Sequence, residues 1–265
     1  MNHFLWLDQI QPSHSSIVGD RALNLSLLRR QGNSVLPGGV VTSIAFEQFF
    51  ASVHQLEPLL ADLPRAALHL NLEDARQLQA IARQIRHSID STPLAADWLN
   101  QAWNAPALLL RPQVLLKAEA EDWLAPQICW AEPDAIATAV KRVWGEVFRT
   151  KSLLYWQRSH LPLPKIRLAV LVMPLSQAIA SGRVRLSATE KTIEGQRGLS
   201  GLAGLDDAIA ANLLALPPAI ASPHYLQLSR DRQSDCLEQV TDPAPQPILD
   251  AVQVQQLLQF VQSIA

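Results

Sequence analysis

The chain has 265 residues, of which 48% are hydrophobic and 17% are charged, so it holds enough apolar material for one large domain or two lobes with a shared core. Its formal net charge of −2, without a basic stripe, argues against nucleic acid as a partner. Cys129 and Cys236 lie far apart and outside metal-ligand spacing, so the sequence suggests neither a disulfide framework nor a zinc site.

No apolar stretch approaches the roughly 20 residues that cross a bilayer. The opening segment MNHFLWLDQI lacks the basic region, apolar run and small-residue cleavage site of a signal peptide. We therefore expect a cytoplasmic protein that does not insert into a membrane.

The first half of the chain predicts helices separated by short strands. Residues 21–31 have helical spacing after a polar turn and Gly19. Residues 40–41 predict a buried strand, and Ser43 is a candidate N-cap for a helix that contains Phe46, Phe49 and Phe50. A longer amphipathic helix is expected from an N-cap at Asn71 to its end at Pro93.

The second half adds most of the expected strands. Two apolar runs in residues 107–118 are interrupted by Pro112, residues 165–173 predict a buried strand, and residues 183–187 alternate like a half-exposed one. A helix is expected from Pro133 to Phe148, residues 231–247 predict a polar, proline-rich loop, and residues 248–264 a final helix. The mixture predicts an α+β fold.

Three segments at the start carry a family resemblance. They are FLWLDQI, VGDRALNLSLL and GNSVLPGGVVTSIAFEQFF. In order and approximate spacing they resemble the opening of the phosphoenolpyruvate synthase and pyruvate phosphate dikinase family. That family has an apolar Trp-Leu segment, then V-G-G-K-x-A-x-L-x-E-L, then G-x-x-V-P-x-G-F and a helix with paired aromatic residues.

Later segments are similar to the family more faintly. They are ALLLRPQ (to the strand that ends A-V-R-S-S), VWGEVF (to V-W-x-S-L-F), GQRGLSG (to W-G-L-G-E) and SPHYLQLSR (to N-P-D-E-F). The resemblance implies one ATP-grasp-like nucleotide-binding domain over residues 1–265, with two lobes of mixed sheets and flanking helices. The expected parts are a glycine-loop and helical lobe (1–105), a strand-rich lobe (106–230), a polar loop (231–247) and a C-terminal helix (248–265).

The resemblance also implies a residual phosphate-binding group. Gly19 matches the first glycine of the family loop, Arg21 stands for its lysine, and Arg111 matches the arginine of A-V-R-S-S. Asp20 replaces the second glycine, and a carboxylate there repels a polyphosphate unless it is turned away or compensated. The alternative for Arg21 and Arg111 is ion pairing at the surface or between lobes, and the sequence leaves both interpretations open.

At several other family positions, this chain has a residue whose side chain lacks the functional group of the family residue. The two serines after the arginine are Pro112 and Gln113, and the A-G-Q element is Ala125-Pro126-Gln127. The glutamine, glutamate and aspartate of the later motifs align with Met173, Gly201 and His224. The sequence stops at Ala265, before the family segment that supplies metal-binding carboxylates. We therefore expect no catalytic residue, no metal site and no required cofactor.

Three functions stay open at this stage. The first is a non-catalytic assembly or regulatory module that captures an unidentified protein partner, for which Trp123 and Trp156 are candidate contacts, unless these tryptophans are core residues. The second is a sensor that binds ATP or another adenine nucleotide without turnover. The third is an ATP-dependent phosphotransfer subunit whose phosphohistidine and pyruvate-binding domains are encoded separately.

Overall fold

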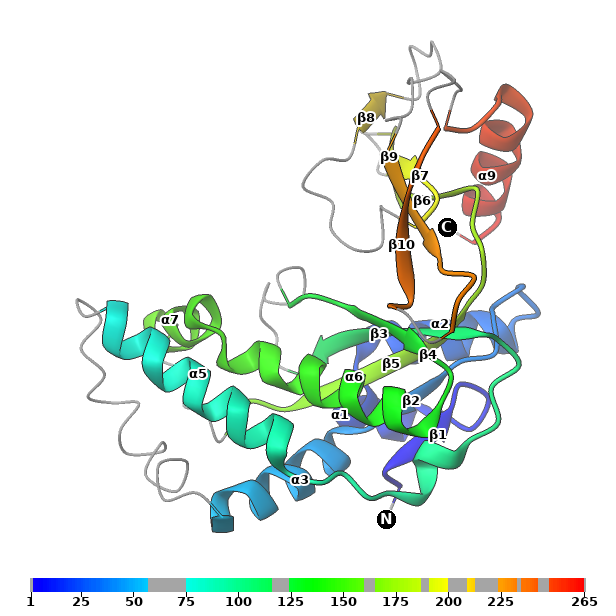
Figure 1. Cartoon of the computed structure of the whole chain (residues 1–265). Coiled ribbons are helices and arrows are strands. Elements are labelled where there is room, and N and C mark those ends of the chain that lie inside the picture. Colours follow the sequence, from blue (N-terminus) through cyan, green and yellow to red (C-terminus); the bar gives the residue numbers. More distant parts are fainter. Residues whose placement is uncertain are drawn as a thin grey trace. The chain divides into compact units, whose positions relative to one another are not determined.

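The structure is a computed structural model, and it divides the chain into two compact units, Met1–Pro174 and Leu175–Ala265 (Figure 1). The boundaries expected at residues 105, 230 and 247 stay predictions. Asn71, Trp123 and Gly201 lie outside the described residues. The residues that the structure describes are 2–56, 75–115, 124–159, 165–186, 191–199, 209–212, 224–232, 235–242 and 248–264.

A five-stranded sheet forms the centre of the first unit. Its strand order is β1 (Phe4–Trp6), β2 (Gly39–Val41), β5 (Leu168–Leu175), β3 (Ala107–Val114) and β4 (Gln127–Trp130). The β1–β2, β2–β5 and β3–β4 pairs are antiparallel. The strands expected at residues 40–41 and 165–173 are confirmed, and the mixture of this sheet with helices is compatible with the expected α+β class.

Side chains of this sheet alternate between two separate apolar cores. On β5, Leu168, Val170 and Val172 belong to one core, whereas Ala169 and Leu171 belong to the other. A strand that is buried on both faces reads as a continuous apolar run, which is why KIRLAVLVM was recognisable in the sequence.

Two short helices cover one face of the sheet. They are α1 (Ser15–Val18) and α2 (Asp20–Arg30). The second confirms the helix expected after Gly19, whereas α1 lies before Gly19 and was not expected. A 3-10 turn, η1 (Pro12–His14), precedes them. Their apolar side chains, with those of β1, β2 and β5, form the smaller core.

A larger helical layer covers the other face (Figure 1). At its centre the Trp144 ring lies 5.0 Å from the Phe49 ring and 6.0 Å from the Phe46 ring, so aromatic packing joins two of its helices. The helix α7 was not expected from the sequence. The layer consists of α3 (Ser43–Leu56), α5 (Ala75–Ser91), η2 (Asp97–Asn100), α6 (Pro133–Gly145), η4 (Glu146–Phe148) and α7 (Thr150–Arg158).

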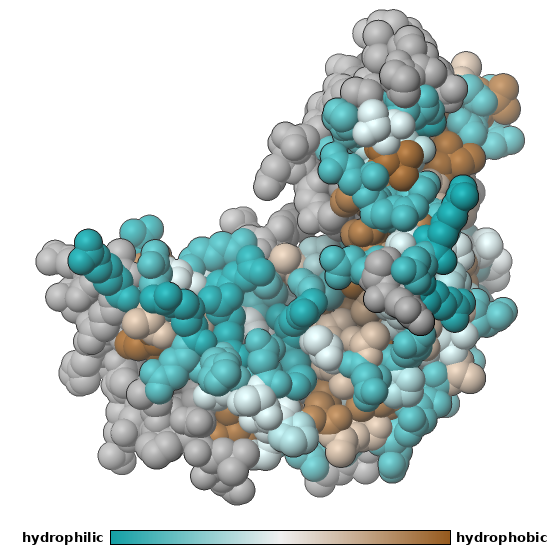
Figure 2. Space-filling model, viewed as in Figure 1, coloured by the Kyte–Doolittle hydropathy of each residue, from teal (hydrophilic) through white to brown (hydrophobic). Residues whose placement is uncertain are grey.

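The outward side of α5 is hydrophilic, as Figure 2 shows. Its exposed residues Gln79, Arg83 and His87 stand opposite the buried Leu78, Ile85 and Ile89, which are part of the expected apolar stripe. The amphipathic pattern of this helix is therefore explained by its packing against α6, α7 and η4.

The second unit contains two further sheets and a helix. The strands β6 (Ala180–Leu186), β7 (Lys191–Arg197) and β8 (Ile209–Asn212) form an antiparallel sheet. The strands β9 (His224–Leu228) and β10 (Leu237–Thr241) form an antiparallel pair, and α9 (Ala251–Ile264) confirms the final helix. The expectation of a loop over residues 231–247 is wrong for β10. In the described part of the chain, no helix is long and apolar enough to cross a membrane.

Candidate functional site

Gly19 forms the junction between α1 and α2. Its φ is +85°, a conformation that favours glycine, and its carbonyl oxygen accepts the N–H of Leu23 at 3.1 Å, in the first turn of α2. Asp20 follows as the first residue of α2, and its side chain is exposed. An acidic residue in the first turn stabilises a helix, and here it faces away from the buried side of the loop.

Gln113 reaches this junction from β3. Its side chain is 0% exposed, and its Oε1 accepts a hydrogen bond of 3.2 Å from the backbone N–H of Ala22 in the first turn of α2. A Cβ atom added to Gly19 would lie 2.9 Å from the same oxygen. The open N-terminus of α2 is therefore capped from inside the protein by an uncharged amide.

The other half of the Gln113 amide is unpaired. Its Nε2 is buried and has no hydrogen-bond partner among the described residues. A buried donor without a partner costs about 1–3 kcal/mol. The position of Gln113 is thus a compromise in which one half of the amide is satisfied and the other is not.

The residues predicted to bind phosphate have backbone positions close to the side-chain amide of Gln113. Arg111 is two residues from Gln113, so strand alternation puts both on the same face of β3. Arg21 directly precedes the N–H that Gln113 binds, and both arginines are half-buried. The fold therefore brings the chain positions of Gly19, Arg21 and Arg111 together, and their binding role stays a prediction.

Glu146 is a buried carboxylate that the sequence reading did not single out. It is 3% exposed, its Oε2 accepts the backbone N–H of Ala125 at 3.2 Å, and its Oε1 lies 2.6 Å from an Arg149 nitrogen. It stands at the serine position of the V-W-x-S-L-F element, and a glutamate inside the apolar run VWGEVF was the available signal. Glu146 fixes the A-P-Q segment against the end of α6.

Burial raises the pKa of the Glu146 carboxyl above its ordinary value of 4.5. The hydrogen bond from Ala125 and the nearby Arg149, Lys151 and Arg86 act in the opposite direction and reduce this shift. Desolvation is the larger effect, because the carboxylate lies in the wall of the larger core.

The tryptophans proposed as partner contacts have different positions. Trp156 is 1% exposed, and its Nε1–H donates to the Val147 carbonyl at 3.0 Å, so its indole is part of the core of the first unit. This burial agrees with the alternative that such tryptophans are core residues, which Trp144 also follows at 0% exposure. Trp123 lies outside the described residues.

Two of the later motifs meet in the second unit. Gly198 of GQRGLSG forms a β-bridge with Leu226 of SPHYLQLSR, and the Arg197 guanidinium lies 4.5 Å from the centre of the Tyr225 ring. Arg197 also forms a 2.7 Å ion pair with Asp242. His224, at the aspartate position of the family motif, has its Nδ1 3.0 Å from the Thr241 hydroxyl.

Metal binding finds no support in the residues that are described. Over these ranges, no group of three or more His, Cys, Asp and Glu side chains is arranged to hold an ion. Met173, at the glutamine position of V-Q-x-M, contributes to the smaller core and has no oxygen to offer a metal.

Comparison with known proteins gives distant relatives. No protein-family model matches the chain. It is 22% identical to a probable phosphoenolpyruvate synthase of Methanothermobacter thermautotrophicus over 80% of this chain and 32% of that protein. It is 24% identical to a rifampicin phosphotransferase of Streptomyces sviceus over 80% of this chain and 25% of that protein. It is also 24% identical to a probable phosphoenolpyruvate synthase of Archaeoglobus fulgidus over 79% of this chain and 29% of that protein.

The chain is therefore distantly similar to phosphoenolpyruvate synthase-like phosphotransferases over most of its length. It spans about a third or less of the length of these relatives. The family resemblance is confirmed at this level, whereas the ATP-grasp fold and the loss of catalysis stay predictions.

Proposed function

We propose that this chain is a non-catalytic relative of the nucleotide-binding part of these phosphotransferases and acts as an assembly or regulatory module. The observation that carries the proposal is the hydrogen bond from the Ala22 N–H to Gln113 Oε1. Free N–H groups at a helix N-terminus are what an anion such as a phosphate binds. In α2 one of these N–H groups already has an internal, uncharged partner.

The charges around the α2 N-terminus also support this proposal. Asp20 in the first turn adds a negative charge to the end of α2 that a polyphosphate would approach. Phosphoryl transfer of this kind further depends on a bound metal ion, and the described residues offer no acidic cluster for it. Capping by Gln113 and loss of the metal ligands would act together against turnover.

A second candidate function is a nucleotide sensor. Arg21 and Arg111 carry it, because both are half-buried and lie beside the capping amide in the chain. A guanidinium keeps its charge when partly buried and binds phosphate through two parallel hydrogen bonds. Such a site would hold an adenine nucleotide without needing a metal ion.

A third candidate is a phosphotransfer subunit that works with separate chains. Its support is the similarity to a probable phosphoenolpyruvate synthase and to a rifampicin phosphotransferase, of which the chain spans only about a third or less. The missing parts would then be supplied in a complex.

Calorimetric titration of the purified chain with ATP, ADP and AMP, with and without Mg²⁺, separates these functions. The module predicts no binding of any nucleotide. The sensor predicts micromolar binding that the Arg21→Ala, Arg111→Ala double variant loses, while a matched Arg83→Ala, Arg142→Ala variant of exposed arginines keeps it. Turnover of ATP by the chain, alone or in a complex, would refute the non-catalytic proposal.

A further inference from the structure

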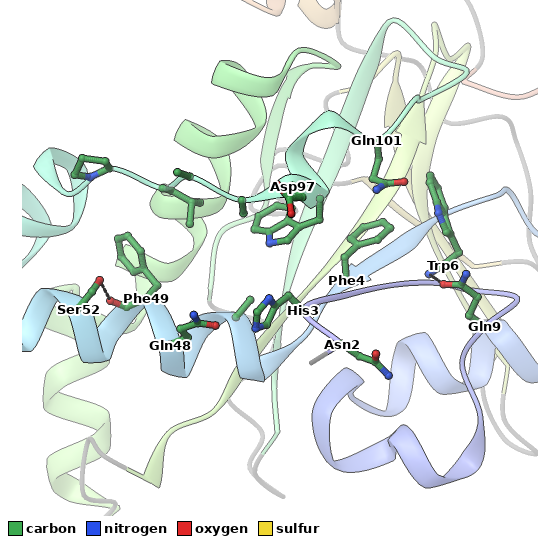
Figure 3. A pocket seen from close by; sticks show the side chains of 16 residues that line it. Asn2, His3, Phe4, Trp6, Gln9, Gln48, Phe49, Ser52, Asp97 and Gln101 are labelled. Carbon is green, nitrogen blue, oxygen red and sulfur yellow. Dashed lines mark hydrogen bonds between the residues drawn. The ribbon is translucent and has the colours of Figure 1, made fainter.

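The first unit contains a cavity on the other face of the sheet from Gly19 and Gln113. Its volume is about 750 Å³, and it is lined by the chain before and within β1, one side of α3, and the segment that leads into η2 (Figure 3). Phe4 and Phe49 in its wall pack with the larger core, whereas Gly19 borders the smaller one. A cavity of this size matches those that hold small molecules.

Aromatic rings form much of the cavity wall. The Phe4 and Trp6 rings meet edge to face with centroids 5.1 Å apart, and the Trp103 ring supports Trp6 from 4.9 Å. Phe49 and Trp98 also line the cavity, and Figure 3 shows Phe49 and Trp6 at different ends of it. Ring faces and edges of this kind hold a flat apolar group well.

The polar groups of the wall fall into two sets. The first set is used within the protein: Gln9 Oε1 accepts the Trp6 N–H at 3.0 Å, and the Ser52 hydroxyl donates to the Phe49 carbonyl at 2.6 Å. The second set is Asn2, His3, Gln48, Gln101 and Asp97. The buried Nε2 of His3 has no hydrogen-bond partner among the described residues, so a ligand group that reaches it would remove an existing cost.

The charge of the wall favours some ligands over others. Asp97 is its carboxylate, and none of the described residues that line the cavity is Lys or Arg. A cation is therefore attracted both by Asp97 and by the faces of the rings, whereas an anion is repelled. This preference is opposite to that of a phosphate site.

We propose that this cavity binds a small uncharged or positively charged molecule that carries an aromatic ring. The ring packs between Phe49 and the Phe4–Trp6 wall, and polar atoms of the ligand pair with His3, Gln48 or Gln101. A cationic group lies toward Asp97. This site is independent of the nucleotide question, because it lies on the opposite face of the sheet and has the opposite charge preference.

Fluorine-19 NMR of the full chain labelled with 5-fluorotryptophan tests this, with Trp6 and Trp98 signals assigned from Trp→Phe variants. The probes are phenethylamine, phenylacetamide and phenylacetate, which share a ring and differ in charge. The first two should shift the Trp6 and Trp98 signals saturably, with the millimolar dissociation constants typical of such small ligands. Phenylacetate should bind at least severalfold more weakly.

Two variants make the test specific. Asp97→Asn should weaken phenethylamine about two- to fivefold, as suits an exposed charge pair, and leave phenylacetamide unchanged. The matched Asp134→Asn change on α6 should alter neither. Gln48→Phe, at an exposed position of α3, should fill the cavity and abolish the shifts. Shifts that never saturate, that are equal for phenylacetate, or that survive Gln48→Phe would overturn the proposal.

Discussion

Replacing Gln113 with serine should turn the first turn of α2 into a weak anion site. Serine removes the acceptor of the Ala22 N–H, which leaves this buried donor without a partner at a cost of about 1–3 kcal/mol, and one buried methylene, worth about 0.8 kcal/mol. It also removes the unpartnered Nε2, whose burial costs about 1–3 kcal/mol. These changes oppose each other, so the free energy of unfolding without ligand should change by no more than about 1 kcal/mol.

The gain appears when an anion is added. If pyrophosphate binds the opened turn with a dissociation constant of about 1 mM, then about 10 mM pyrophosphate stabilises the folded state by about 1.4 kcal/mol. The original chain, with its N–H already bound by Gln113, should gain far less. Urea unfolding followed by circular dichroism, with sodium chloride at matched ionic strength as the reference, measures this difference.

A variant with a side chain of similar volume distinguishes the loss of the capping acceptor from the opening of space beside α2. Gln113→Met removes the acceptor but keeps the side chain long, so it should not respond to pyrophosphate. Adding Arg21→Ala to Gln113→Ser should reduce the response, because the nearby positive charge is lost. Equal stabilisation of the original chain and of Gln113→Ser by pyrophosphate would refute the reasoning that Gln113 blocks the anion site.

Four further predictions concern single side chains. Gly19→Ala should cost at least about 1 kcal/mol more in urea unfolding than Gly32→Ala, which has the same φ of +85° but open space around its Cβ; equal costs would contradict the close contact at Gly19. Because burial raises the pKa of Glu146, its contribution to stability is present below pH 4.5 and is lost as the pH rises through the folded-state pKa; Glu146→Gln should remove this part of the pH dependence of the urea midpoint. Trp156→Ala should lower the free energy of unfolding by about 3–5 kcal/mol and Trp156→Phe by about 1–3 kcal/mol. Unchanged stability of the Trp156→Ala chain would contradict the burial of this indole. Burial raises the pKa of Cys236 to about 11, so at pH 8 iodoacetamide should modify it about 100-fold more slowly than a thiol of pKa 9.0, as mass spectrometry can follow.

The parts of the fold that the sequence predicted are those with a single strong local signal. Residues 168–175 are apolar on both sides, and α5 carries an amphipathic stripe, so each could be recognised without knowing its neighbours. The strand β10 was missed because its composition LEQVT is mostly polar, and its pairing with β9 is what makes it a strand. The helix α7 was missed because its buried indole looked like a surface group in mixed surroundings.

The candidate site shows the same limit. The positions of Gly19, Arg21 and Arg111 could be taken from the resemblance, and the fold does bring their backbones together. The role of Gln113 could not, because its hydrogen bond joins residues 91 positions apart. From the sequence, Gln113 was interpreted only as the replacement of a family serine, whereas in the structure its amide caps the N-terminus of α2.

This capping gives Gly19 a structural reason that needs no nucleotide. Its positive φ carries the chain from α1 into α2, and its missing side chain leaves room for the amide of Gln113 to reach the N–H of Ala22. A helix end that is buried in this way must find a partner for its N–H groups whether or not a phosphate ever binds. A glycine loop followed by a helix is thus required here by folding alone. The resemblance of VGDRA to a phosphate loop therefore supports nucleotide binding only if an anion can displace the amide of Gln113.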